Sequence, residues 1–156
     1  MSNHENLSTY IQDHLAGARF AVNLLEDLSK NSPRRIATMA NRLLPEIEQD
    51  RAVLERILDR LERRISYSKE FVAWFAQKAG RIKLSLSTAF GQFEAVETLS
   101  LGVLGKLALW RTLQTIEPTP AWLTEVDLSG LIQRARAQHR QLERLRLQLA
   151  KAAFGR

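Results

Sequence analysis

Seven carboxylate and histidine side chains occur at positions where a helical protein could assemble a metal centre. His14 and Asp50 fall in register with apolar residues that recur every three or four positions. Carboxylates together with imidazoles are ligands suited to iron or manganese. The sequence therefore defines a candidate metal-ligand set, which comprises His14, Glu46, Asp50, Glu94, Glu97, His139 and Glu143.

Apolar periodicity predicts the helices that must position these side chains, and no strand pattern competes with it. Ser2 and Glu5 have the spacing of a capping box at the start of the first helix. Bundle interiors collect side chains from facing helices, which is where such proteins build metal sites. We expect one all-α domain over residues 1–156, an antiparallel four-helix bundle with one additional short helix, with helices near residues 7–28, 33–65, 69–79, 92–113 and 128–154.

Several helix boundaries are predicted from proline, glycine and capping residues. Ser32 is expected to cap the second helix, and Pro45 to kink it or divide it in two. Gly80 is expected to end the short helix, so that residues 81–91 form a connection. Thr124 and Asp127 have capping-box spacing before the last helix.

The segment 92–113 is apolar on every side of a helical wheel, which is typical of a helix in the interior. Glu94 and Glu97 lie three residues apart on one face of it, so we expect them to be drawn into the core. Buried ion pairs with arginines such as Arg51, or with Lys106, are an alternative to metal binding.

Asp50 and His14 also have readings that need no metal. Asp50 would find a basic or backbone partner, and His14 would be a packed, hydrogen-bonded core histidine. The aromatic residues are expected in the core, with an aromatic box around a ligand as the alternative. They are Phe71, Trp74, Phe75 and Trp110.

Composition restricts the remaining classes of function. The chain has no cysteine, which excludes disulfides, thiolate zinc sites and cysteine nucleophiles, and this fits a cytoplasmic protein. No window approaches the roughly 18 apolar residues of a membrane span, so we expect a soluble protein without a membrane partner. The formal net charge is +6, and Arg136, Arg140 and Arg144 form a positive stripe on the last helix. This stripe makes nucleic acid an alternative partner.

The chain resembles the ferritin-like bundle family in its order of helix pair, connection and second helix pair. The phrases YIQDHLAGARFAVNLL, IEQDRAVLERIL, WFAQKAGRIKL and LGVLGKLALW are similar to a bacterial group of unassigned function within or near that family. The resemblance implies two metals held by a Glu on each of two helices and a Glu-x-x-His on each of the other two. Glu94 or Glu97 would stand for a bridging glutamate, with Asp50 and His14 as approximate ligands.

This sequence departs from the family pattern because it contains no Glu-x-x-His. Ile11 stands three residues before His14, and Arg136 stands three residues before His139. An arginine there places positive charge where the family has a carboxylate ligand. We therefore expect a non-catalytic structural or protein-interaction module with a degenerate metal site and no cofactor, acting as a homodimer or with an unknown protein partner. The alternatives are a di-iron or manganese oxidoreductase and a basic nucleic-acid accessory protein.

Overall fold

Helices form all the regular structure of the computed structural model, which describes residues 2–155. No strand occurs within this range, so the predicted all-α class is confirmed. The helices are α1 (Asn3–Asn31), α2 (Arg34–Arg60), α3 (Lys69–Ser85), α4 (Ala89–Gln114), α5 (Ala121–Thr124) and α6 (Leu128–Phe154).

Side-chain caps begin four of the helices. The predicted capping box of α1 is confirmed, because the Ser2 hydroxyl accepts from the Glu5 backbone N–H and the Glu5 carboxylate accepts from the Ser2 N–H. Ser68 and Thr88 cap α3 and α4 in the same way. The caps predicted at Ser32 and Thr124 are wrong: Pro33 precedes α2 without a side-chain cap, and Asp127 itself caps α6.

The chain stays helical at two positions where the sequence allowed a helix to end: α2 is not divided at Pro45, and α3 does not end at Gly80. Pro45 lies inside an uninterrupted α2, at an exposed position where water can hydrate the carbonyl that loses its helical donor. Gly80 has no positive φ and lies inside α3, which continues to Ser85. The predicted connection 81–91 is therefore reduced to the three residues 86–88 between α3 and α4.

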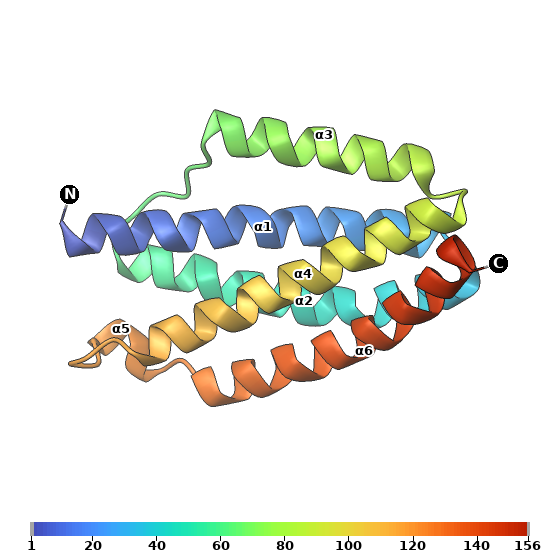
Figure 1. Ribbon diagram of the computed structural model, residues 1–156. Helices are drawn as coiled ribbons and strands as arrows, with labels where there is room; N and C mark the ends of the chain where they lie inside the picture. Colours follow the sequence, from blue (N-terminus) through green and yellow to red (C-terminus); the bar gives the residue numbers. More distant parts are fainter. Residues whose placement is uncertain (1, 156) are drawn as a thin grey trace.

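Two antiparallel helix pairs make the bundle, as Figure 1 shows: α1 packs against α2, and α4 packs against α6. In chain order, α3 comes after the first pair and before the second. It runs back along the length of the molecule, so that α4 runs in the same direction as α2. Helix α3 contacts both α1 and α4. None of the helices within residues 2–155 is both long enough and apolar enough to cross a membrane.

Only one side of α4 faces the interior of the bundle. Trp110 and Leu109 are fully buried, whereas Leu101 is 62% exposed and Leu104 is 40% exposed. The prediction that the segment 92–113 is interior on every side is therefore wrong. One apolar flank of α4 has no helix packed directly on it, and this flank faces the space beneath α3.

The α3–α4 turn depends on Gly91, because a Cβ there would lie 1.9 Å from the Ser85 carbonyl oxygen. We predict that Gly91→Ala lowers the free energy of unfolding by about 2 kcal/mol through overpacking. The exposed helical Gly80 has open space around an added Cβ, so Gly80→Ala should stabilise by about 0.5–1 kcal/mol. Urea unfolding of the two variants measures both effects, and equal stabilities would contradict the prediction.

Candidate functional site

Asp50 is the buried carboxylate of the bundle, with only 2% of its surface exposed. Its neighbours Ile47 and Leu54 lie on the same face of α2 and place it toward α4 and α6. Lys106 Nζ of α4 donates to Asp50 Oδ2 at 2.5 Å, and Arg134 Nη2 of α6 donates to Asp50 Oδ1. Two cations therefore neutralise one carboxylate that has no access to bulk water.

Gln138 extends these contacts into a network across three helices. Its side-chain oxygen accepts from Lys106 Nζ at 2.5 Å, and its Nε2 donates to Glu46 Oε2 at 2.7 Å. Arg134 Nη1 also donates to Gln49 Oε1 at 3.0 Å. We call the set Glu46, Asp50, Lys106, Arg134 and Gln138 the polar centre.

The charged side chains of the polar centre compensate one another. Its two carboxylates and two cationic side chains balance in formal charge. Burial lowers the pKa of Lys106, and the adjacent Asp50 carboxylate opposes that change by favouring the ammonium. In a low-dielectric interior such a pair is held by both Coulomb attraction and direct hydrogen bonds.

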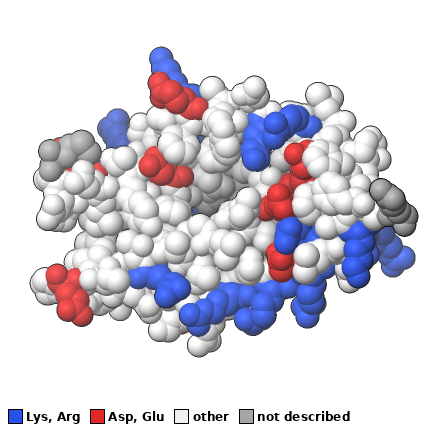
Figure 2. Space-filling model, in the orientation of Figure 1, with Lys and Arg blue, Asp and Glu red and all other residues white. Residues whose placement is uncertain are grey.

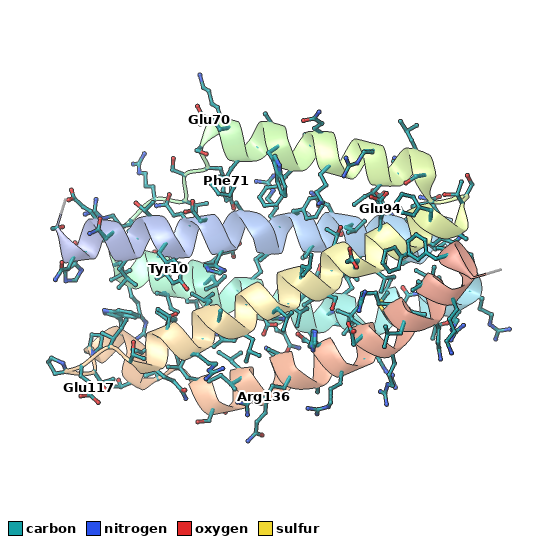
Figure 3. The ribbon with its side chains drawn as sticks, viewed as in Figure 1. Tyr10, Glu70, Phe71, Glu94, Glu117 and Arg136 are labelled. Carbon is teal, nitrogen blue, oxygen red and sulfur yellow. The ribbon has the colours of Figure 1, made fainter. Side chains whose placement is uncertain are left out.

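A second cluster joins α4 to α6 nearer the surface. Arg146 donates to Glu143 at 2.6 Å and to Glu97 at 3.0 Å. Its guanidinium lowers the pKa of the Glu143 carboxyl. The prediction that Glu94 and Glu97 enter the core is wrong, since both are only half-buried. The alternative of an ion pair with an arginine holds for Glu97, although its partner is Arg146 and not Arg51 or Lys106. Glu94 lies near the N-terminal end of α4 (Figure 3).

The predicted ligand set is thus divided among separate places. Glu46 and Asp50 belong to the polar centre, while Glu97 and Glu143 share Arg146. His14 of α1 is half-buried with its ring 4.8 Å from that of Tyr10, and burial lowers its pKa. His139 is half-buried on α6. Within residues 2–155, no three His, Asp or Glu side chains come together in a way that could hold a metal ion.

A cavity of about 440 Å³ lies directly beside the polar centre. Its walls come from α1, α2, α3 and α4, and Asp50 and Lys106 form part of its lining. Figure 2 shows the corresponding hollow beneath α3. His14 lines the same cavity, so it faces the space next to Asp50 without bonding to it.

Sequence reasoning missed Arg134 and Gln138 as members of the site. A signal for Gln138 exists, because it occupies the core stripe of α6 between Ala135 and Leu142 and is 2% exposed. A polar amide at such a position requires a buried hydrogen-bonding partner. Arg134 offers no equivalent signal, since it lies at the edge of the stripe, where arginines are ordinarily solvated.

Comparison with known proteins gives no family assignment. No family model, curated protein or solved structure matches this chain. The arrangement of helices and the chemistry of the polar centre are therefore the basis of the functional argument.

The polar centre predicts a specific pattern of stabilities. Lys106→Met removes one cation from a buried carboxylate and should lower the free energy of unfolding by about 3 kcal/mol. The double variant Lys106→Met/Asp50→Leu removes the buried charge as well, so it should recover most of that loss. Urea unfolding of Lys106→Met, Asp50→Leu and the double variant gives the coupling energy between the two residues. Additive losses of stability would contradict the assignment.

Proposed function

We propose that the protein is a non-catalytic interaction module with a ferritin-like bundle, in which an ion network occupies the position of a metal centre. The observation that carries this proposal is the double neutralisation of Asp50 by Lys106 and Arg134. A metal-binding carboxylate needs its oxygens free for a cation. Here both oxygens accept hydrogen bonds from cationic side chains.

The connectivity of the helices supports the ferritin-like part of the proposal. Ferritin-like bundles contain two antiparallel helix pairs joined by one long crossover. In this chain the pairs are α1 with α2 and α4 with α6, and the segment containing α3 crosses the length of the bundle between them. The crossover makes α2 and α4 parallel, an arrangement that direct hairpin connections would not produce.

The charges at the centre favour an interaction role over redox chemistry. A metal pair at Asp50 would have to displace the Lys106 ammonium and the Arg134 guanidinium, or lie beside two positive charges. His14, Glu94 and His139 also lie outside the polar centre. The alternative of an iron or manganese oxidoreductase would therefore require the centre to rearrange.

The exposed arginines of α6 support a second candidate, docking on nucleic acid. Arg136, Arg140 and Arg144 are exposed, and none of them forms an ion pair within the described part of the chain. Figure 2 shows lysine and arginine side chains gathered along the edge formed by α6, and Arg136 is labelled on this helix in Figure 3. Repetition every four residues places the three guanidinium groups on one face, where they could contact successive phosphates.

Metal analysis tests the proposed module. Protein produced with Fe(II) and Mn(II) in the medium and purified without chelator should contain far less than one metal ion per chain. Added Fe(II) or Mn(II) should leave the melting temperature unchanged, because no vacant ligand set gains from binding. Two ions per chain, lost in Asp50→Asn, would contradict the proposal and favour the oxidoreductase.

Salt-dependent binding tests the second candidate. A 20-base-pair duplex DNA should bind at low salt with an affinity that falls as salt rises, because phosphate contacts release counterions. Arg136→Gln/Arg140→Gln/Arg144→Gln should reduce the log–log salt slope by about 3, one for each lost phosphate contact. The charge-matched control Arg35→Gln/Arg42→Gln/Arg56→Gln alters exposed arginines of α2. If both triple variants weaken DNA binding equally, net charge alone would account for the binding. A specific DNA-binding face on α6 would then be excluded.

A further inference from the structure

The cavity beneath α3 has an almost wholly apolar wall. Trp74 and Phe75 line it from α3, Gly102 and Gly105 from α4, and Leu25 from α1. Its volume of about 440 Å³ falls within the range of roughly 300–1,000 Å³ that is typical of small-molecule sites. An added Cβ at Gly102 or Gly105 would meet nothing within 4 Å, so both glycines border open space.

Helix α3 covers this cavity while burying little of its own surface. Ile82 is the only buried residue among its 17 residues, all of which lie in the described part of the chain. Trp74 is 53% exposed and Phe71 is 38% exposed, although both side chains line the cavity. Phe71 lies on the side of α3 that faces α1, as Figure 3 shows. The sequence expectation that these two aromatic residues belong to the core is wrong.

One aromatic side chain attaches α3 to the bundle beside the cavity. The Phe75 ring stacks on that of Phe20 in α1, with 4.9 Å between their centroids. Phe75 also approaches Gly17, where an added Cβ would lie 4.0 Å from its ring. Phe71 and Trp74 line the cavity and are partly exposed, so an apolar molecule bound there would remove some of their surface from water, which favours binding.

The charged groups that face the cavity cancel one another. Asp50 and Lys106 form the floor and are bonded to each other, and Gln138 accepts a further Lys106 hydrogen bond. Asp13 and Lys78 line the cavity at more exposed positions, and the Lys78 ammonium lies 5.2 Å from the centroid of the Trp74 ring. An anionic ligand would have to compete with Asp50 for Lys106, and a cationic one with Lys106 for Asp50. The lining is therefore complementary to an uncharged molecule.

The shape of the cavity distinguishes a small molecule from a helix of another chain. The space reaches Asp50 and Leu142, close to the bundle axis, and α3 covers it while contacting α1 and α4. A helix is about 10 Å wide with its side chains, so it would require α3 to leave. A small molecule needs no such displacement.

We propose that this cavity is a binding site for a small, uncharged, predominantly apolar molecule that is held between the aromatic face of α3 and the glycine-lined flank of α4. This site goes beyond the proposed interaction role, because it binds a small molecule in the interior of the bundle. It also lies apart from the α6 arginines of the nucleic-acid candidate, and the polar centre serves only as its floor. Ligand in the cavity contacts both helices and so holds α3 against the bundle.

Fluorescence titration with N-phenyl-1-naphthylamine, an uncharged aromatic probe, tests the site. The full-length protein should bind one probe per chain, and amide hydrogen exchange in α3 should slow on binding. Competition then defines the charge preference, with 1-dodecanol used below its solubility limit and dodecanoate and dodecylammonium below their micelle concentrations. Dodecanol should displace the probe at a concentration at least tenfold lower than either ion; equal or better displacement by an ion would overturn the assignment.

Two variants locate the probe, and a third serves as the matched control. Gly105→Leu fills the cavity from α4 and should weaken probe binding at least tenfold, whereas Gly80→Leu introduces the same side chain on α3 outside the lining and should change it less than twofold. Trp74→Ala, at an exposed position, should weaken binding without preventing folding, which circular dichroism verifies. Unchanged affinity in both cavity variants would overturn the proposal. So would light scattering that shows a dimer converted to monomer by Gly105→Leu, because the occupant would then be a second copy.

Discussion

The neutralisation of Asp50 by Lys106 and Arg134 is the interaction on which the arrangement of the bundle depends. A carboxylate that is 2% exposed is tolerated only if its charge is compensated where it lies. The compensation comes from α4 and α6, so the axial positions of these helices relative to α2 are restricted to those that bring all three side chains together. Apolar side chains alone would permit several such positions with similar burial, which is why a polar contact is more restrictive than additional leucines.

The two sides of α4 differ in what packs against them. Toward α6 and α2, this helix contributes Lys106 and fully buried residues such as Trp110. Toward α3, it presents leucine and glycine with little packed against them. Because α3 buries only Ile82, its attachment has few apolar contacts, and helices of this kind open at a lower free energy than the core. The crossover is therefore the part of the bundle best suited to move around a ligand.

The polar centre, the cavity beneath α3 and the α6 surface differ in their chemistry. The polar centre is held together by hydrogen bonds among its own side chains, which engage both oxygens of Asp50 and the side-chain amide of Gln138. The cavity next to it is apolar and balanced in charge, with Asp50 and Lys106 forming the boundary between the two regions. The α6 surface carries Arg136, Arg140 and Arg144, which form no salt bridge with a carboxylate of the described residues. The second region is the proposed ligand site and the third is the surface of the nucleic-acid candidate, while the first links α2, α4 and α6.

The sequence by itself determined the all-α class, the capping box at Ser2 and Glu5, and the position of Asp50 on an apolar stripe, because local spacing and capping chemistry depend only on neighbouring residues. Tertiary structure alone decided the partners of Asp50, which are separated from it by 56 and 84 residues. It also decided that Glu97 stays half-exposed and that Trp74 borders a cavity. Periodicity specifies which face of a helix is apolar, but the depth of that face and the helix opposite it depend on how the elements pack.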